Sequence, residues 1–231
     1  MRNVASPDIN TEDFSAAVDF LALQSFVDSD KIGILGIYGF GGFALNAATI
    51  DTRIKAVVAS TMYDMSRVSA YGYNDVMDES ERTKLRASLN AKRLDDLKNA
   101  DFERAPGLPD KLSGKEPKFV ADYWEYYKTP RGFHPRSINS NDGWHATSSL
   151  TLMNNKLLAF VDEMSQPALI MHGENAHSLY FSKTAYSKLK GDNKELLIIK
   201  NANHTDLYDQ KDKIPFNKIE SFYKANLKWK G

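Results

Sequence analysis

A glycine-rich turn between two apolar segments constrains the fold of this chain more than any other feature. The segment Lys31–Ile37 is apolar without polar alternation, which is typical of a parallel strand covered on both faces. It runs into the turn Gly36-Ile37-Tyr38-Gly39-Phe40-Gly41-Gly42, and Phe43–Ala48 after the turn suits a buried helix. Ile54–Ser60 is a second apolar strand. Strand, helix and strand within roughly thirty residues predict a right-handed βαβ unit.

The same pattern returns near the C-terminus. The elements predicted there are strand Ala168–His172, helix Phe181–Leu189, strand Glu195–Lys200 and a closing helix Pro215–Trp229. A helix Thr11–Leu23 is also predicted before the glycine turn, because Asn10 is a typical helix start and Phe14, Ala17, Val18 and Leu21 recur at helical spacing. The chain therefore predicts four parallel strands alternating with helices.

The middle of the chain differs in composition from the segments on either side. Residues 61–160 are rich in charge, aromatic residues and turn residues, and hold no clear apolar strand. Asp78–Ala100 predicts a solvated amphipathic helix. We expect a lid or cap insertion at 61–160 within a core made of 1–60 and 161–231. The predicted fold class is α/β, a mostly parallel sheet flanked by helices with a helical lid insertion.

Charge and composition exclude several classes of binding partner and of chemistry. Thirty basic and thirty acidic residues balance to a net charge of zero, which gives no electrostatic case for nucleic acid or an anionic membrane. The absence of cysteine excludes disulfides and thiolate chemistry. Met1–Asp13 does not read as a signal peptide, so a cytoplasmic location is expected. The uncharged run Ile32–Ile50 holds five glycines and is better explained by strand, turn and helix than by a membrane span.

A tight glycine turn of this kind can present a nucleophile above a sheet, as in G-x-S-x-G. Gly36 takes the first glycine position, Tyr38 the nucleophile position, and Phe40 replaces the second glycine. Gly39 follows the nucleophile position, and its N–H is the predicted oxyanion donor.

Several segments resemble a bacterial α/β-hydrolase family related to dienelactone hydrolases and X-prolyl peptidase-like (S15-type) proteins. The segments that carry the resemblance are Gly36–Ala48, Ser60–Ser66, Tyr126–Gly132, His172–His177 and His204–Asp209. The family turn usually reads Gly-Ile-Cys-Gly-Trp-Gly-Gly, so Tyr38 stands where the family carries Cys or Ser. The resemblance implies hydrolysis of an ester or related acyl bond of a small molecule, without a cofactor.

His204 is the predicted general base, because it follows the last strand and preserves the chain order of nucleophile, acid and histidine. The acid is expected after the strand Ala168–His172. Glu174 is the nearest carboxylate there, with Asp206 and Asp209 as alternatives and helix or turn capping as an equally good explanation.

The resemblance begins at the helix before the turn, so the chain is expected to be N-terminally shortened, by natural truncation or a misassigned start. The strand 31–37 would then be an apolar open edge, which proteins normally cover, charge or pair. We expect a second copy of the chain to cover it, giving a homodimer.

Two alternatives compete with hydrolysis. A nicotinamide-binding enzyme would use Gly36-x-x-Gly39-x-Gly41 and the Y-x-x-x-K of Tyr186–Lys190, but Ser60 stands where the ribose-binding acid belongs. His134, His145, His172 and His177 lack metal-ligand spacing, so no metal is expected.

The stronger alternative is a non-catalytic pseudo-hydrolase that binds a ligand or oligomerises. A phenol has a pKa of about 10 and is a far weaker nucleophile at neutral pH than an activated thiol or serine. Tyr123, Trp124, Tyr126, Tyr127 and Trp144 would line its site or simply pack in the insertion.

Overall fold

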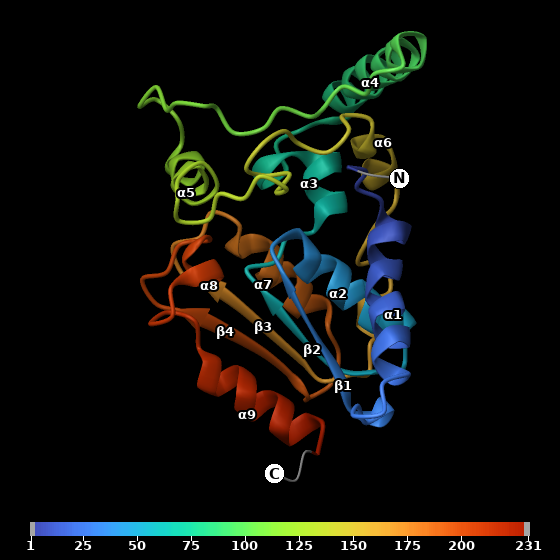
Figure 1. The fold of residues 1–231 in the computed structure, drawn as a ribbon, viewed down its shortest axis with the longest axis vertical. Coiled ribbons are helices and arrows are strands. Elements are labelled where there is room, and N and C mark those ends of the chain that lie inside the picture. The colour runs from blue at the N-terminus through green and yellow to red at the C-terminus, as the bar shows by residue number, and fades with distance from the viewer. Residues whose placement is uncertain (1–2, 229–231) are drawn as a thin grey trace. The chain divides into compact units, whose positions relative to one another are not determined.

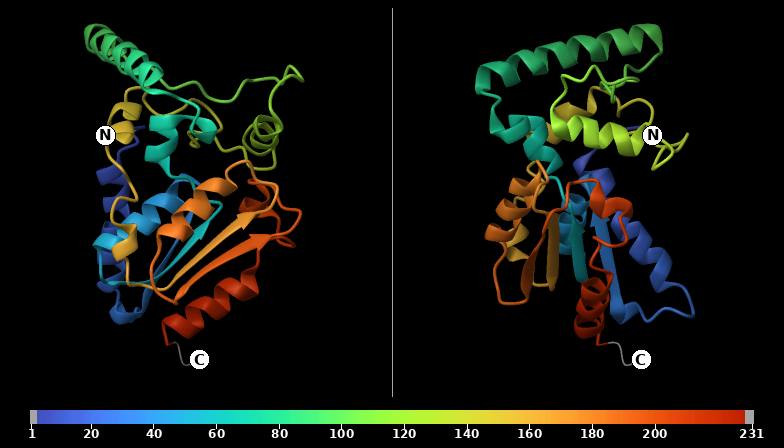
Figure 2. Two further views of the ribbon diagram at one scale, coloured as in Figure 1. Left: turned by 180° about the vertical axis from the view of Figure 1, so that it is seen from behind. Right: turned by 90° about the vertical axis from the view of Figure 1, so that its left-hand side faces the viewer.

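The computed structural model describes residues 3–228, which form two compact units. The sheet unit consists of 7–65 and 157–228, and the helical unit consists of 3–6 and 66–156. Each unit is traceable by its colours in Figure 1 and, from two further directions, in Figure 2.

The sheet unit is built on a four-stranded sheet in which neighbouring strands are parallel and the order is β1-β2-β3-β4. The strands are β1 (Ile32–Ile37), β2 (Ile54–Ser60), β3 (Ala168–Gly173) and β4 (Lys194–Ile199). The α/β fold with a parallel sheet flanked by helices is therefore confirmed, and the strand bounds agree with the predicted ones to within about one residue.

The strand register brings the carboxyl ends of the strands to one edge of the sheet. Ile37 pairs with Ser60 at the ends of β1 and β2, and Gly173 pairs with Ile199 at the ends of β3 and β4. The segments that follow these strand ends are therefore neighbours in space, which is where parallel α/β sheets carry their sites.

Helices cover both faces of the sheet (Figures 1 and 2). The helices α2 (Gly39–Ile50) and α7 (Leu179–Lys188) lie on one face, and α1 (Pro7–Ala22) packs on α2. On the other face lies α9 (Phe216–Asn226), whose Phe222 packs on side chains of β2 and β3. Coverage on both faces explains why the strands read as apolar runs.

The glycines of the turn are explained by close packing. A Cβ on Gly36 would overlap the carbonyl of Phe40, and one on Gly42 would overlap the carbonyl of Tyr63. The helix α2 begins at Gly39, four residues before the predicted start. The predicted start was wrong because it was based on helix propensity, and glycine is unfavourable in an isolated helix. In the folded chain, close packing around the turn favours glycine at these positions.

The first helix also begins earlier than predicted. It begins at Pro7, which suits a first helical turn, whereas Asn10 and Thr11 are buried inside the helix. The hydroxyl of Thr11 donates to the carbonyl of Pro7 and accepts from the side-chain amide of Asn46 in α2. This contact with α2 accounts for a polar residue where a cap was predicted.

Short elements complete the sheet unit: η1 (Ser29–Lys31), η3 (Val161–Glu163) and α8 (Asp206–Asp209). The closing helix α9 ends at Asn226, and Trp229, the predicted end, lies outside the described residues.

The helical unit holds α4 (Glu79–Asn99), close to the predicted 78–100. It also contains most of α3 (Met65–Tyr71), together with η2 (Tyr73–Asp75), α5 (Lys118–Tyr127) and α6 (Ser148–Asn154). Its buried cluster is Ala70, Leu89, Ala146 and Met153. The sequence did not predict α3 or α6, because each is short and lacks a long periodic pattern.

The long helix α4 starts with a capping box, in which the Asp78 side chain accepts from the Glu81 N–H and the Glu81 carboxylate accepts from the Asp78 N–H. Leu89 is buried, whereas Leu94 and Leu97 are exposed. No helix within residues 3–228 is long and apolar enough to cross a membrane.

Candidate active site

The backbone of Tyr38 is strained. Its φ of 59° and ψ of −127° lie in a region that favours glycine, at the junction of β1 and α2. Three hydrogen bonds hold it there: its N–H donates to the Ser60 carbonyl (3.1 Å), and its carbonyl accepts from Gly41 (3.0 Å) and Tyr63 (2.9 Å). This is the backbone arrangement that raises a side chain above the sheet at a nucleophile turn.

Gly39 follows directly as the first residue of α2. Its N–H has no acceptor within the helix, because the first four N–H groups of a helix lie beyond the reach of its carbonyls. An N–H at this point can stabilise a developing negative charge.

Thr61 is a second strained residue, directly after β2. Its φ of 44° is rare for a β-branched residue, and its side chain is fully buried. The N–H of Thr61 donates to the Met171 carbonyl (2.7 Å), and its hydroxyl lies 2.9 Å from Nδ1 of His204. Strain at two neighbouring strand ends points to a functional site.

The loop after β4 crosses the end of β3 and brings His204 into the site. A Cβ on Gly173 would lie 2.7 Å from the carbonyl oxygen of Asn203 and would overlap that of Ala202, so only glycine lets the loop pass. The Ala202 carbonyl also accepts from the Asn175 N–H (2.9 Å). His204 is thereby 2% exposed.

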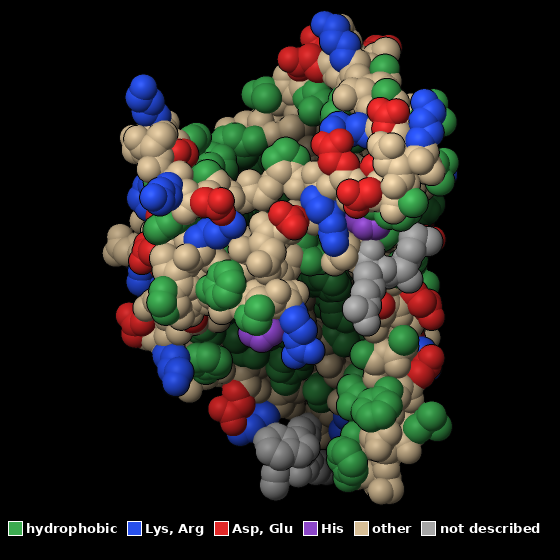
Figure 3. All heavy atoms as spheres, turned by 45° about the horizontal axis from the view of Figure 1, so that its top comes forward, with side chains coloured by type: hydrophobic (Ala, Val, Ile, Leu, Met, Phe, Trp, Pro, Cys, Tyr) green, Lys and Arg blue, Asp and Glu red, His purple; other side chains and the backbone are tan. Residues whose placement is uncertain are grey.

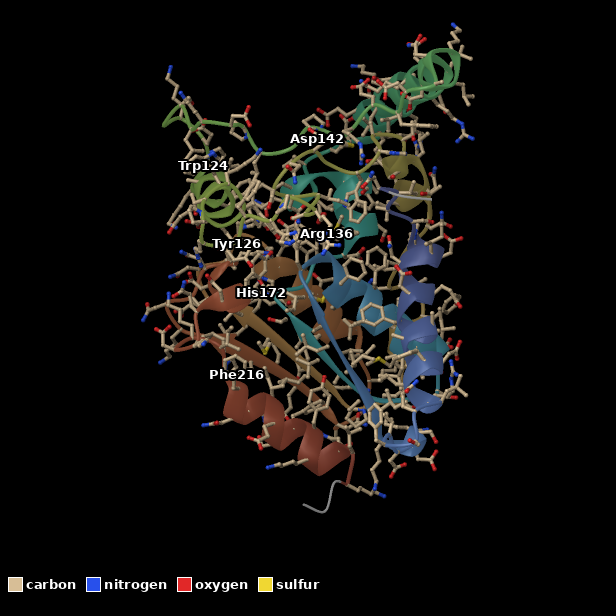
Figure 4. All side chains as sticks on the ribbon, in the orientation of Figure 1. Trp124, Tyr126, Arg136, Asp142, His172 and Phe216 are labelled. Carbon is tan, nitrogen blue, oxygen red and sulfur yellow. The ribbon has the colours of Figure 1, made fainter. Side chains whose placement is uncertain are left out.

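His204 belongs to a buried chain of hydrogen bonds. Its Nδ1 lies 2.6 Å from the Ser178 hydroxyl and its Nε2 lies 2.7 Å from the Tyr208 hydroxyl. The Ser178 hydroxyl is also 2.9 Å from Nε2 of His172, and Nδ1 of His172 is 2.6 Å from the Ser182 hydroxyl. Figure 4 shows His172 at the carboxyl end of the sheet.

Aromatic rings surround Tyr38. Its ring centroid lies 4.8 Å from that of Tyr63 and 5.1 Å from that of His204, both in edge-to-face geometry. The ring of Tyr208 is 6.4 Å away. The hydroxyl of Tyr63 is hydrogen-bonded to Nε2 of His177 at 2.5 Å. The turn is therefore set among phenol and imidazole groups of the sheet unit.

Both buried histidines are neutral at physiological pH. Burial lowers the pKa of His172 to about 3, with a further contribution from the charge of His177. Burial also lowers the pKa of His204 well below its usual value, and repulsion from the protonated forms of His172 and His177 acts in the same direction. Neutral imidazole is the form that can accept a proton, and the lowered pKa makes each ring a weaker base than imidazole in water.

Two of the predicted acids, Glu174 and Asp206, form hydrogen bonds with the loop that carries His204. The carboxylate of Glu174 accepts from the N–H of Asn201 (3.1 Å), and the structure gives it no hydrogen bond to His204. Asp206 accepts from the Asn203 N–H (2.9 Å) and pairs with Lys213 (2.6 Å). Asp209 ends the short helix α8. Glu174 and Asp206 therefore hold the loop that carries His204.

Of the predicted site residues, the structure brings Tyr38, Gly39 and His204 together. Sequence reasoning missed the roles of Thr61, Ser178 and Tyr208. Their positions could have indicated them, because Thr61 follows a predicted strand and Ser178 precedes a predicted helix at the same edge of the sheet. Among residues 3–228, no three His, Asp or Glu side chains gather in a way that could hold a metal ion.

Charge is mixed over the face drawn in Figure 3, where Lys and Arg side chains alternate with Asp and Glu. Hydrophobic side chains gather at the lower right of that view, over the end of α1 and the turn after it. In α1 and the turn after it, Phe20, Leu23 and Phe26 are 65%, 84% and 83% exposed.

Structural comparison places the chain in the class of proteins with the α/β-hydrolase fold. The α/β hydrolase GrgF from Penicillium sp. sh18 superimposes with a TM-score of 0.76 over 99% of this chain and 75% of that one, at 17% identity. The crystal structure of the Pseudomonas aeruginosa protein PA2218 superimposes with a TM-score of 0.93 over 97% of this chain and 70% of that one, at 50% identity.

Sequence comparison then gives the family. The chain is 50% identical to PA2218 over 227 residues, which span 98% of this chain and 61% of PA2218. It is 32% identical to YcjY of Escherichia coli over 222 residues, which span 91% of this chain and 68% of YcjY. No protein-family model matches the chain. The chain belongs to the family of YcjY and PA2218, which has the α/β-hydrolase fold.

Proposed function

We propose that this chain hydrolyses an ester or related acyl bond of a small molecule at the Tyr38 turn. The observation that carries the proposal is the strained backbone of Tyr38. Beside it lie the N–H of Gly39, which has no acceptor within α2, and the buried, neutral imidazole of His204. The three groups supply a nucleophile position, an oxyanion donor and a base in the order of an α/β-hydrolase.

The proposed reaction begins with proton transfer from the phenol of Tyr38 to Nε2 of His204. The phenolate oxygen attacks the carbonyl carbon, and the Gly39 N–H donates to the oxyanion. The bond to the leaving oxygen breaks, and that oxygen takes the proton from His204. Water then hydrolyses the acyl–Tyr38 ester and restores the phenol. An aryl ester is a reactive acyl donor, because phenolate is a good leaving group, so this second step is favourable.

Glu174 acts indirectly in this proposal. Because its carboxylate accepts from the N–H of Asn201, it fixes the start of the loop that ends at His204. In this proposal the two hydroxyl groups at Nδ1 of His204 take the place expected for the triad acid.

The test is hydrolysis of p-nitrophenyl acetate and butyrate by the wild-type chain and by Tyr38→Phe, Tyr38→Ser and His204→Ala. Tyr38→Phe and His204→Ala are expected to lower kcat/KM by at least about 100-fold, and Tyr38→Ser to raise it. Mass spectrometry should find the acyl group on the peptide that contains Tyr38.

Tyr186→Phe is the matched control, because Tyr186 is a partly exposed phenol on α7. Wild-type turnover in both Tyr38→Phe and His204→Ala would refute the proposed site.

A second candidate function is ligand binding without turnover by a pseudo-hydrolase. The observation that favours it is that Nε2 of His204, the atom that would take the proton, is already hydrogen-bonded to the Tyr208 hydroxyl. In that case p-nitrophenyl esters are not turned over, and their acid products quench the fluorescence of the chain by binding without reaction.

We also propose that two copies associate through the edge strand 31–37. Within the described residues β1 is the outer strand of the sheet, and its Leu35 and Ile37 are 39% and 40% exposed. Pairing of an open edge removes unsatisfied backbone groups and exposed apolar surface. Light scattering is expected to give twice the chain mass, and Leu35→Lys the single mass. A monomeric wild type at micromolar concentration would contradict this.

Other expectations stay predictions. These are the lid role of 61–160, the cytoplasmic location and the kinship with dienelactone hydrolases and S15-type proteins. A small-molecule substrate is the expected partner, with no nucleic acid and no membrane.

A further inference from the structure

The hydroxyl of Ser178 lies between two buried imidazole rings. It is 2.6 Å from Nδ1 of His204 and 2.9 Å from Nε2 of His172, and Ser178 itself is fully buried. Because a hydroxyl has a single proton, it can donate to one of these nitrogens and must accept from the other.

The position of Ser178 makes this use of its hydroxyl unusual. Ser178 is the residue before α7, where serine normally accepts a hydrogen bond from the first turn of the helix. Its side chain makes no such capping bond, and both of its hydrogen bonds go to the imidazoles. The hydroxyl therefore serves the histidines and not the helix.

Two proton arrangements satisfy the chain. In the first, Nδ1–H of His204 donates to Ser178, Ser178 donates to Nε2 of His172, and Nδ1–H of His172 donates to Ser182. In the second, every one of these bonds is reversed. Only the first leaves Nε2 of His204 as an acceptor, which is what a base requires.

The Thr61 hydroxyl is compatible with both arrangements, including the first. It lies 2.9 Å from Nδ1 of His204 and 3.3 Å from the carbonyl oxygen of the same residue. When Nδ1 carries its proton toward Ser178, Thr61 can donate to the carbonyl, and no donor is left facing another donor.

We propose that Ser178 is a positioning residue that replaces the acid of the catalytic triad, holding His204 as the Nδ1–H tautomer through its hydrogen bond to His172. Triad carboxylates accept from the same nitrogen and fix the same tautomer, but they also stabilise the imidazolium. Here the second partner is neutral, so orientation is provided without a buried charge. Both the choice of this tautomer and the role in catalysis rest on the proposed function, in which Nε2 of His204 accepts a proton.

The kinetic test compares Ser178→Ala, Ser178→Thr and Ser187→Ala. Ser178→Ala is expected to lower kcat at least about 10-fold with little change in KM, because it removes an interaction with the base and not with substrate. Ser178→Thr keeps the hydroxyl and should retain most of kcat. Ser187→Ala, the same change at an exposed site of α7, should leave kcat unchanged.

The direct test is ¹⁵N NMR of the histidine rings, which needs no turnover. Wild-type His204 is expected as Nδ1–H, and Ser178→Ala should shift it toward Nε2–H, because Thr61 then donates to Nδ1. A wild-type His204 in the Nε2–H form overturns the inference even if no variant folds. So does a Ser178→Ala variant with unchanged tautomer and kcat.

The two proposals can fail separately. If no ester is hydrolysed but His204 is Nδ1–H and responds to Ser178→Ala, the proposed function fails and the positioning role stands. If esters are hydrolysed through His204 and Ser178→Ala has no effect on tautomer or kcat, the reverse holds.

Discussion

Tyr38 combines two properties that local preferences oppose. A bulky side chain sits at a φ of 59° and ψ of −127°, where strain costs about 1–3 kcal/mol. Hydrogen bonds from Gly41 and Tyr63 to its carbonyl and edge-to-face contact with Tyr63 and His204 maintain it. A nucleophile turn uses the same strained backbone to project its side chain from the end of the sheet.

The strain is measurable with a matched pair of variants. Tyr38→Gly and Tyr38→Ala lose the same ring contacts and differ only in the Cβ. Because glycine adopts this backbone freely, Tyr38→Gly is expected to be more stable than Tyr38→Ala by about 1 kcal/mol in urea unfolding, the reverse of the usual order. An alanine variant of equal or greater stability would show that the turn is unstrained.

At the scale of the elements, α9 covers one face of the sheet through two neighbouring aromatic residues, Phe222 and Tyr223, of which Phe222 is the more deeply buried. Phe222 is 4% exposed and packs against Ala56 and Val58 of β2 and Leu169 and Met171 of β3. Burial of a phenylalanine side chain stabilises a fold by about 1.5–3 kcal/mol, and truncation adds the cost of the cavity.

Phe222→Ala is therefore expected to lower the free energy of unfolding by about 3–5 kcal/mol. Phe216→Ala, at the exposed first residue of the same helix, should change it by less than about 1 kcal/mol. Figure 4 labels Phe216 at the start of α9. Equal losses in chemical denaturation would mean that α9 is not held through Phe222.

At the scale of the molecule, the buried imidazoles link stability to pH. The pKa of His172 is about 3 in the folded chain and 6.5 in the unfolded chain, so between these values only the unfolded chain binds the proton. The contribution of His172 to the free energy of unfolding is therefore fully present above pH 6.5 and is lost as the pH is lowered. Ser178, Ser182 and His204 face His172, and His204 contributes in the same direction.

The expected loss is about 1.4 kcal/mol per pH unit for each such histidine. Urea unfolding at pH 7.0, 6.0 and 5.5 measures it, with exposed His134→Gln as the variant that should retain the slope. Asp51, whose pKa is lowered to about 2 by Arg53, affects stability only below about pH 4 and does not interfere. A free energy of unfolding that is constant from pH 7.0 to 5.5 would contradict buried neutral imidazoles.

The sequence by itself determined the four strands, their alternation with helices and the place of the turn, because apolar periodicity and glycine content are local properties. It also indicated Tyr38, Gly39 and His204, since chain order and strand ends are visible in the printed residues. It misplaced the starts of α1 and α2, where contacts such as Asn46 with Thr11 outweigh local preference.

Only the tertiary structure decided what surrounds His204. Thr61 lies 143 residues before His204 and Ser178 lies 26 before it, and each is brought there by strand register and by the close approach of a loop to Gly173. Hydrogen bonding of a buried imidazole depends on distances of a few tenths of an ångström between groups far apart in the chain. No local pattern encodes such distances, so the sequence did not indicate the two hydroxyls that lie at Nδ1 of His204.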